Sequence, residues 1–302
     1  MVEKAKRKII ITGVNGMLGS DLQKQFAAHY EICGTDITSV PAQAREFFCC
    51  DIRSVDQVKE VFSSVKPWLV IHGAAYADVD GCETDPQKAD LINAQGTKNV
   101  AQACSQIGAK LIYISTDYVF DGEKGDSYLE TDAVNPINAY GRSKLAGEEF
   151  VRSLVTESLI VRTSWLFGKT GKNFVETIIS LAKQQKQLTI VSDQRGSPTH
   201  TVSLAKAIEM LIDSVFCDSG NPVNRGVYHV SNSDSCSWYD FAKRIVALKG
   251  IEVEILPVDS NTFMRPAKRP QMSVLDNSRY QKLTGDILCS WHKALENYLF
   301  AE

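Results

Sequence analysis

Tyr140 and Lys144 stand four residues apart in the segment Asn138-Ala-Tyr-Gly-Arg-Ser-Lys144. On a helix this spacing places the phenol and the ammonium one above the other on one face. That face continues through Gly147 and Val151, so it is the apolar face that turns inward. An ammonium beside a phenol lowers the phenol's pKa from its usual value of about 10. The pair is therefore a candidate acid–base catalyst for a carbonyl or an alcohol; the alternative is a lysine that snorkels past a packed tyrosine.

The hydroxyl of Thr116 is a second candidate group, within Ser115-Thr-Asp-Tyr-Val-Phe-Asp-Gly122. The apolar run 111–114 predicts a strand that ends just before it. Side chains at the carboxyl ends of parallel strands lie in the crevice where open sheets bind ligands. We therefore expect Thr116 to hydrogen-bond the same substrate oxygen that Tyr140 protonates. An ordinary loop cap is the alternative for a single threonine.

A glycine-rich turn follows the first predicted strand, in Gly13-Val-Asn-Gly-Met-Leu-Gly19. Glycines allow a tight turn and a close approach to a pyrophosphate, and the next helix offers unpaired N–H groups. Asp36 follows about 20 residues later, where a carboxylate accepts from a ribose 2′-hydroxyl. The turn predicts a dinucleotide site, although its G-x-x-G-x-x-G spacing differs from the dehydrogenase G-x-G-x-x-G. Asp36 favours NADH, because a 2′-phosphate would face a carboxylate; Arg45 is a nearby residue that could offset this preference.

Short apolar runs alternate with longer amphipathic stretches over the first half of the chain. Continuous apolar runs are typical of strands that helices cover on both faces. The alternation predicts right-handed crossovers and an open parallel sheet. The predicted strands are 8–12, 31–34, 69–72, 111–114 and 159–161, and the predicted helices lie near 17–29, 54–65, 87–107 and 137–155.

The pattern changes after Trp165 to helices near 173–186, 201–215, 237–248 and 290–299, separated by loops rich in Gly, Pro, Asp and Ser. We therefore expect an α/β protein in which residues 1–165 form a Rossmann-like, doubly wound parallel sheet that binds NAD(P). Residues 166–302 are expected to form mainly a smaller, partly interleaved α+β substrate domain. Parts of 198–225 are expected to return to the first domain.

The composition is that of a soluble globular protein: 302 residues, 44% apolar and 23% charged, with a net charge of −3. The near-neutral charge argues against a nucleic-acid partner. No apolar run reaches the roughly 18 to 20 residues that span a bilayer. No secretory signal is predicted, so a cytoplasmic location is expected. The eight cysteines form no Cys-x-x-Cys pair, which favours reduced thiols over disulfides or zinc.

Together these motifs resemble the extended branch of the short-chain dehydrogenase/reductase superfamily. More narrowly, the chain resembles the dTDP-4-dehydrorhamnose reductase family nearly from end to end. The stretches that carry this resemblance are 74–83, 92–94, 115–122, 162–165, 173–175, 193–199, 226–229, 237–242 and 265–267.

The resemblance implies a reductase that moves hydride from NADPH or NADH to the C4 ketone of a nucleotide-linked, dTDP-type 4-keto-6-deoxyhexose. It implies that Tyr140 donates the proton, that Lys144 lowers the tyrosine's pKa and holds the nicotinamide ribose, and that Thr116 assists at the carbonyl oxygen. The residues that match sugar positions are Val79, Thr116, Tyr118, Tyr140 and Trp165. Those that match cofactor positions are Gly13, Asn15, Gly16, Met17, Leu18, Gly19, Asp36, Asp51, Ile52, Ala74, Ala75, Tyr76, Asn93, Tyr140 and Lys144.

Some relatives in this family dimerise through Mg²⁺ held by acidic residues. Asp21 lies at one such position and Glu296 near another. Acidic residues on surface helices usually face water, so Mg²⁺ is given no site here and a homodimer stays open.

The second domain carries weaker signals. Trp238 and Tyr239 are expected to serve core or domain packing, and His72 and His229 are expected to be structural histidines. Arg265 and Arg269 fit a diphosphate contact and a solvated loop equally well.

Two other functions stay open. A non-catalytic regulatory subunit of the methionine adenosyltransferase β-subunit type keeps the same fold, but it has no physical need of a lysine on a buried face. A sugar-nucleotide epimerase or dehydratase shares the fold and the Tyr/Lys pair. Dehydratases usually show an Asp-Glu pair after the threonine, whereas this chain has Asp117-Tyr118.

Overall fold

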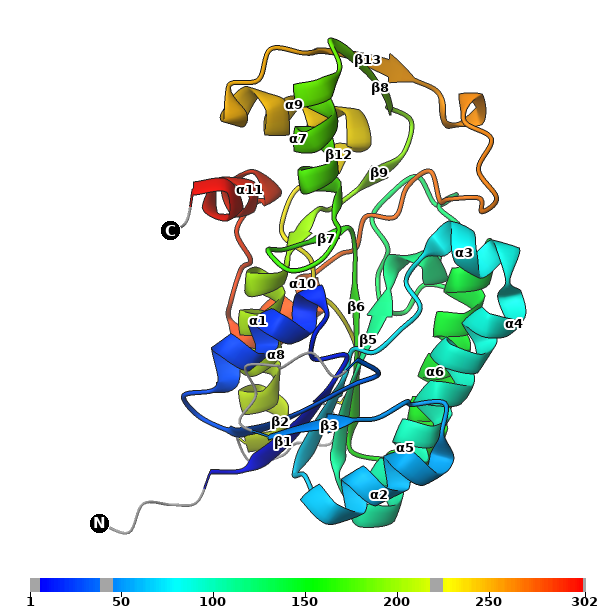
Figure 1. Cartoon of the computed structure of the whole chain (residues 1–302), viewed down its shortest axis with the longest axis vertical. Coiled ribbons are helices and arrows are strands. Elements are labelled where there is room, and N and C mark those ends of the chain that lie inside the picture. Colours follow the sequence, from blue (N-terminus) through cyan, green and yellow to red (C-terminus); the bar gives the residue numbers. More distant parts are fainter. Residues whose placement is uncertain (1–5, 39–45, 218–224, 301–302) are drawn as a thin grey trace.

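The computed structural model describes residues 6–38, 46–217 and 225–300; Arg45 lies outside these ranges. Seven parallel strands form one sheet in the order β11-β6-β5-β4-β1-β2-β3 (Figure 1). The strand order reverses direction between β1 and β4, which is the arrangement of the predicted Rossmann-like, doubly wound fold. The strands are β1 (Lys8–Thr12), β2 (Glu31–Asp36), β3 (Glu46–Cys49), β4 (Leu69–His72), β5 (Lys110–Thr116), β6 (Ser158–Thr163) and β11 (Gly226–His229).

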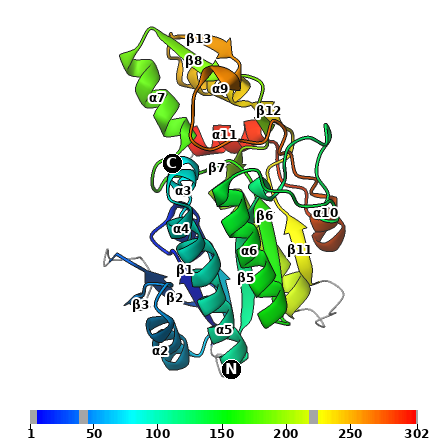
Figure 2. The same cartoon turned by 90° about the vertical axis from the view of Figure 1, so that its right-hand side faces the viewer.

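Helices cover both faces of this sheet. Ile9 and Ile11 of β1 belong to the core on the face that carries α1 and α8, whereas Ile10 belongs to the core beneath α2, α5 and α6. Figure 2 shows α5 and α6 lying over the second of these faces. The central strands are therefore buried on both sides, as their continuous apolar runs predicted. The covering helices are α1 (Met17–Phe26), α2 (Val55–Val65), α5 (Thr97–Ile107), α6 (Ala139–Leu154) and α8 (Thr201–Ile212).

Some predicted helices have different limits in the structure. The first ends at Phe26 rather than near 29, and the helix predicted near 201–215 ends at Ile212. The helix predicted over 87–107 is divided into α4 (Pro86–Ala89), a π-helical turn η1 (Asp90–Gly96) and α5. Just after η1, the hydroxyl of Thr97, the first residue of α5, donates to the Asn93 carbonyl at 2.6 Å, while the Asn93 side chain bonds outside its own helix. Such π turns are frequent at functional sites, and no sequence periodicity encodes them.

A second layer is built by α7, α9 and α11 on short two-stranded sheets, at the top of Figure 1. Its own apolar core includes Phe167, Phe241 and Trp291. After Trp165 the chain also returns to the main layer, because α8 packs on α1 and β11 pairs with β6. The elements of this half are β7 (Leu166–Phe167), α7 (Phe174–Gln184), β8 (Gln187–Val191), β9 (Arg195–Gly196), β10 (Thr199–His200), η3 (Asp213–Cys217), β12 (Cys236–Ser237), α9 (Trp238–Lys249), β13 (Glu254–Val258), η5 (Ser260–Thr262), α10 (Ser278–Thr284) and α11 (Trp291–Phe300).

Glu148 in α6 anchors that helix to the sheet. Its carboxylate accepts two hydrogen bonds from Arg162 of β6, at 2.8 and 2.7 Å, and one from the Ser115 hydroxyl of β5 at 2.7 Å. Both charged side chains are almost fully buried. Arg152, at the rim, adds a further contact to the same carboxylate at 2.6 Å.

Glu148→Gln should destabilise the fold strongly, because it leaves the Arg162 guanidinium buried without a counter-charge. We expect a loss of about 3–5 kcal/mol in the free energy of unfolding, measured from urea transitions. Glu149→Gln is the matched control, since Glu149 is exposed and should change stability by less than about 0.5 kcal/mol. Equal unfolding midpoints for the two variants would contradict the structural role of this ion pair.

Candidate active site

The glycine-rich turn joins β1 to α1 at the carboxyl edge of the sheet. Gly13 has φ = +71°, in the left-handed region that favours glycine, and its N–H donates to the Thr35 carbonyl at 2.8 Å. A Cβ at Gly13 would lie 2.8 Å from the Ala74 nitrogen, so the approach of the loop after β4 also requires glycine. No side chain caps the N-terminus of α1 after Gly16. The free N–H groups and the helix dipole together suit a pyrophosphate.

A cavity of about 460 Å³ opens beside this turn. On its wall, the Asp36 carboxylate accepts from the N–H of Asn15 at 3.1 Å and of Ile37 at 2.8 Å. Asp51 pairs with Arg53 at 2.6 Å, and this contact holds the pKa of the Asp51 carboxyl below its usual value. A cavity with apolar walls and a few fixed polar groups fits the nucleoside of a dinucleotide. Its lining residues are Gly13, Gly16, Thr35, Asp36, Ile37, Cys50, Asp51, Ile52, Arg53, Gly73, Ala74, Ala75, Tyr76, Lys88 and Ile92.

The remaining predicted cofactor residues lie in two places. Met17, Leu18 and Gly19 form the first turn of α1, next to the glycine-rich turn. Asn93 is buried and holds the backbone of Tyr76, accepting from its N–H at 2.7 Å and donating to its carbonyl at 3.1 Å. Asn93 therefore supports the cavity wall rather than facing the cavity.

Sequence reasoning missed two cationic side chains on this cavity, Arg53 and Lys88. Arg53 reaches back across two residues to Asp51, and Lys88 of α4 stands 4.5 Å above the Tyr76 ring. In the sequence, the short separation of Arg53 from the predicted site residue Asp51 was the feature that could have indicated an arginine at this cavity. Both cations supply positive charge beside a nucleotide site.

Tyr140 and Lys144 lie in the part of α6 that faces β5. The Lys144 ammonium donates to the Ile114 carbonyl at 2.7 Å and stands 4.1 Å above the Tyr113 ring. α6 begins at a cap formed by Asn138, whose side chain accepts from the Gly141 N–H at 2.8 Å. This cap fixes the start of the helix, and therefore the position of its first turn, which carries Tyr140.

Thr116 ends β5 and lies next to the tyrosine. Its hydroxyl hydrogen-bonds the Tyr140 phenol, donates to the Asp117 carboxylate at 2.9 Å and accepts from the Tyr118 N–H at 3.2 Å. The structure thus brings the three predicted catalytic residues together at the carboxyl end of β5. Asp117 was not among the predicted site residues, although it is adjacent to Thr116 in the sequence.

The protonation of these groups is set mainly by burial. Desolvation lowers the pKa of the Lys144 ammonium to about 7, although the Glu148 carboxylate opposes this shift. Desolvation also raises the pKa of Asp117 to about 7. The pKa of Tyr140 is raised, first by desolvation and then by the Asp117 charge, while the Thr116 hydrogen bond lowers it.

The sequence predicts the opposite direction for the tyrosine, because it places an ammonium beside the phenol. In the structure, burial raises the pKa of Tyr140 and the Asp117 charge raises it further, while the Lys144 ammonium is directed to the Ile114 carbonyl. The expected lowering of the tyrosine pKa is therefore wrong for this geometry.

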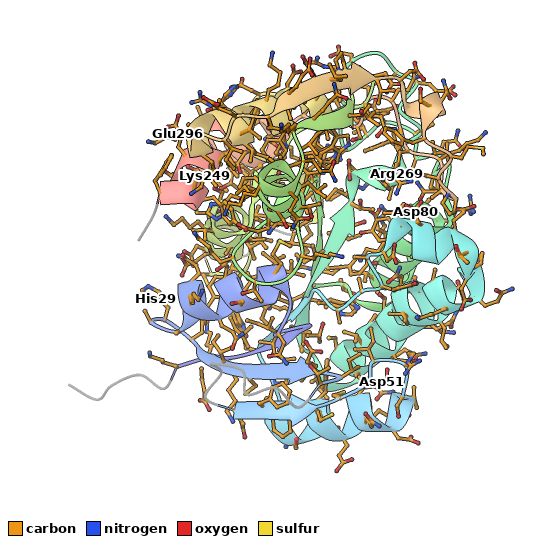
Figure 3. All side chains as sticks on the ribbon, turned by 45° about the horizontal axis from the view of Figure 1, so that its top comes forward. His29, Asp51, Asp80, Lys249, Arg269 and Glu296 are labelled. Carbon is orange, nitrogen blue, oxygen red and sulfur yellow. The ribbon has the colours of Figure 1, made fainter. Side chains whose placement is uncertain are left out.

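A second cavity, of about 570 Å³, lies between the main layer and the α7–α9 layer. Val79 and Tyr118, both predicted sugar contacts, line it together with Arg265 and Arg269. Arg269 forms a bidentate pair with Asp80 at 2.8 and 2.9 Å, and this pairing lowers the pKa of the Asp80 carboxyl. Figure 3 shows Asp80 and Arg269 next to one another. The remaining lining residues are Lys172, Asn173, Phe174, Thr177, Ile178, Leu181, Thr189, Ile190, Val191, Gln194, Trp238, Ser260 and Phe263.

Tyr140 lies between lining residues of the two cavities. Its ring meets the Tyr118 ring edge-on, with centroids 5.9 Å apart, and Tyr118 lines the larger cavity. Tyr140 also packs against the same small apolar cluster as Tyr76, which lines the smaller cavity. The tyrosine is therefore close to the walls of both cavities.

Other predicted residues have structural partners. Asp21 accepts from the Thr201 hydroxyl, and Glu296 pairs with Arg244 at 2.7 Å. Within the described residues, no group of three or more His, Cys, Asp or Glu side chains could hold a metal ion. His72 and His229 are both fully buried. Both ring nitrogens of His72 have hydrogen-bond partners, as expected of a structural histidine, whereas His229 bonds the Tyr128 carbonyl through Nδ1 and its Nε2 has no partner among the described residues. The eight cysteines are free thiols. No helix in the described part of the chain has the length and apolarity that crossing a bilayer requires.

Comparison with known proteins identifies the family. Residues 7–301 match the family model described as RmlD substrate binding domain. The chain belongs to the RmlD family. It is 39% identical to the spore coat polysaccharide biosynthesis protein SpsK of Bacillus subtilis over 97% of this chain and 96% of that protein. It is 36% identical to the dTDP-4-dehydrorhamnose reductase of Aggregatibacter actinomycetemcomitans over 96% and 97% of the two chains.

Solved structures agree with this assignment. A dTDP-4-dehydrorhamnose reductase from Clostridium acetobutylicum is 44% identical, with a TM-score of 0.88 over 97% of this chain and 98% of that one. The Bacillus anthracis dTDP-4-dehydrorhamnose reductase in complex with NADP is 41% identical, with a TM-score of 0.89 over 98% and 100% of the two chains. The Thermus thermophilus UDP-glucose 4-epimerase, at 20% identity and a TM-score of 0.80, shares the fold. The chain is thus an RmlD-like member of the NAD(P)-dependent sugar-nucleotide reductases.

Lys144→Met should make this RmlD-family protein more stable near neutral pH. A lysine whose pKa falls on folding destabilises the folded protein as the pH drops from the lysine's unfolded pKa of 10.5 towards its folded pKa of about 7. Methionine removes that cost. We expect the free energy of unfolding to rise by about 1–3 kcal/mol at pH 7, and this increase should shrink towards pH 10. Urea unfolding at several pH values measures it.

Lys183→Met is the matched control, because Lys183 is exposed in α7. Its stability should follow that of the unmodified protein at every pH. At each pH, the effect of Lys144→Met is the free energy of unfolding of the variant minus that of the unmodified protein. A smaller difference at pH 7 than at pH 10 would contradict the lowered lysine pKa.

Proposed function

We propose that this protein reduces the C4 ketone of a nucleotide-linked 4-keto-6-deoxyhexose with NADPH or NADH, in the manner of dTDP-4-dehydrorhamnose reductase. The observation that carries the proposal is the position of Tyr140 between the two cavities, beside Thr116 and Lys144. The similarity to RmlD-family reductases over nearly the whole chain supports the substrate class.

The residues of the smaller cavity fit a dinucleotide. The glycine-rich turn and the uncapped start of α1 would hold the pyrophosphate, and Asp36 would accept from the adenosine ribose. The bound dinucleotide would supply a hydride for the substrate carbon. Lys144 would hold the nicotinamide ribose through the ammonium that the Ile114 carbonyl orients.

Tyr140 would donate the proton that the reduced oxygen requires. As the C4 carbon accepts hydride, the C=O π bond breaks and its electron pair takes the phenolic proton, which leaves an alcohol and a phenolate. Because the pKa of Tyr140 lies above neutral, the phenol is protonated at pH 7 and has a proton to donate. Thr116 would hydrogen-bond the same oxygen, and Arg265 and Arg269 would contact the diphosphate.

The cavity charges bear on the choice of cofactor. Asp36 disfavours a 2′-phosphate, whereas Arg53 and Lys88 favour one. Because Arg53 is already paired with Asp51, we expect Asp36 to determine the preference and NADH to be used more efficiently.

Tyr140→Phe should reduce turnover about 10²- to 10⁴-fold with little change in cofactor binding, because it removes the proton donor alone. Turnover is followed by the loss of NADH or NADPH absorbance with dTDP-4-dehydrorhamnose, and cofactor affinity by calorimetry. Tyr239→Phe, in α9 and away from both cavities, should keep normal turnover. A Tyr140→Phe protein with unchanged turnover would remove this residue from the mechanism, and absent turnover in the unmodified protein would favour a regulatory subunit.

Asp36→Asn should raise the kcat/KM for NADPH relative to that for NADH by about tenfold. The substitution removes the charge that repels the 2′-phosphate and keeps an oxygen for one of the two backbone contacts of the carboxylate. Asp56→Asn serves as the control, because Asp56 lies in the first turn of α2, outside the cavity. An unchanged ratio of the two kcat/KM values would show that Asp36 does not select the cofactor.

A further inference from the structure

The Thr116 hydroxyl has three hydrogen-bonding neighbours. Its oxygen accepts from the Tyr118 N–H at 3.2 Å and lies 2.9 Å from a carboxylate oxygen of Asp117. The third neighbour is the Tyr140 phenol. A threonine hydroxyl has one proton to donate and two lone pairs with which to accept. Because the Tyr118 N–H occupies one lone pair, the proton and the other lone pair are left for Asp117 and Tyr140.

The protonation state of Asp117 decides how these two neighbours are served. An ionised carboxylate can only accept, so it takes the threonine proton and leaves the lone pair for the Tyr140 side. A protonated carboxyl donates its own proton to Thr116, and the threonine proton then turns towards Tyr140. The same hydroxyl is therefore an acceptor or a donor at the reaction centre, depending on Asp117.

The surroundings of Asp117 favour its protonated form. The residue is 2% exposed, and its Oδ2 atom is buried without a hydrogen-bond partner in the described part of the chain. A buried carboxylate oxygen without a partner is costly when it carries charge. Burial accordingly raises the pKa of Asp117 to about 7, although the Ser273 and Thr116 hydroxyls lower it. Asp117 therefore exchanges its proton near neutral pH.

Most ionisable groups around Asp117 keep a constant charge in this pH range. Its charge acts on Tyr140 of α6 and on Tyr118 of the turn η2 (Asp117–Val119), and both phenols stay neutral because their pKa values are raised. The charged groups that act on Tyr118 from other segments are Arg265, Arg269 and Asp80. Arg269 and Asp80 compensate one another in their bidentate pair. Lys144 also changes its charge near pH 7, so the experiment has to separate it from Asp117.

We propose that Asp117 is a positioning residue that sets the direction of the Thr116 hydroxyl. While Asp117 is protonated, it donates to Thr116, and the threonine proton is offered to the C4 oxygen as hydride arrives. Once Asp117 is ionised, its carboxylate holds that proton, and the reacting oxygen keeps Tyr140 alone as a donor. The proposal rests on the proposed function and deepens it. No covalent step is added, since the proton of the product alcohol still comes from Tyr140.

The test is the pH dependence of kcat/KM from pH 6 to pH 9, with dTDP-4-dehydrorhamnose and NADH on the full chain. The unmodified protein should lose at least about tenfold, because a lost donor at a developing oxyanion costs that much or more. Asp117→Asn should lack this decline, because an amide carries N–H donors and no charge at every pH. Above pH 8 its kcat/KM should exceed that of the unmodified protein. Asp126→Asn, exposed in the following loop, should keep the unmodified profile.

Thr116→Val separates the route through the hydroxyl from a direct effect of the Asp117 charge. Its kcat/KM should be lower at pH 6, and the decline towards pH 9 should largely disappear. A decline of undiminished size in a folded Thr116→Val protein would overturn the positioning role. The same result in Asp117→Asn would also overturn it and would assign the decline to Lys144. A thermal melt shows whether each variant is folded.

Infrared spectroscopy follows the proton on Asp117 without turnover. The C=O band of a protonated carboxyl should be present at pH 6, be lost at pH 9 and be missing from Asp117→Asn. A spectrum at pH 6 that is the same in both proteins would overturn the proposal. If the band behaves as expected but the unmodified protein reduces no 4-keto sugar, the proposed function itself fails; if turnover is normal and the profile of Asp117→Asn is unchanged, only the role of Asp117 fails.

Discussion

The buried carboxylate of Glu148 holds together the part of the structure on which the chemistry depends. It joins α6 to β5 through Ser115 and to β6 through Arg162. It also lies one helical turn after Lys144, and its charge opposes the loss of the lysine's proton. One ion pair therefore fixes the helix that presents Tyr140 and Lys144 and makes a buried ammonium beside β5 less costly. Replacing such a pair by apolar residues often stabilises a protein, so its retention here fits a positional role.

Three ionisable groups at the end of β5 have pKa values shifted by the same cause. Desolvation favours the neutral form of each, so Asp117 and Lys144 titrate near neutral pH and Tyr140 stays protonated. Strongly shifted pKa values in one cleft are typical of functional sites. In this arrangement the proton to be donated is held on Tyr140 by burial, and a hydrogen bond from Thr116 lowers the tyrosine's pKa.

Local features of this fold were predictable, and contacts between distant segments were not. The apolar runs, the glycine-rich turn and the Tyr140–Lys144 spacing each lie within a few residues, so five strands of the sheet and three catalytic candidates followed from the sequence. The edge strands β3 and β11 were not predicted. The π turn η1 depends on bonds from Asn93 to Tyr76, which no periodicity records. The direction of the tyrosine's pKa shift depends first on how deeply the phenol is buried, which the helical spacing does not record.

The junction of the two layers shows why the second half of the site was harder to predict. The Asp80–Arg269 pair and the Trp165–Trp238 stack each join a residue of the main layer to one far along the chain. Both contacts fix the second layer against the sheet at the wall of the same cavity. The left-handed conformation of Trp165 has a local cost, and the stack with Trp238 offsets it only while the layers are together. The strain therefore couples the shape of the larger cavity to the stacking of Trp238, at the start of α9, on Trp165.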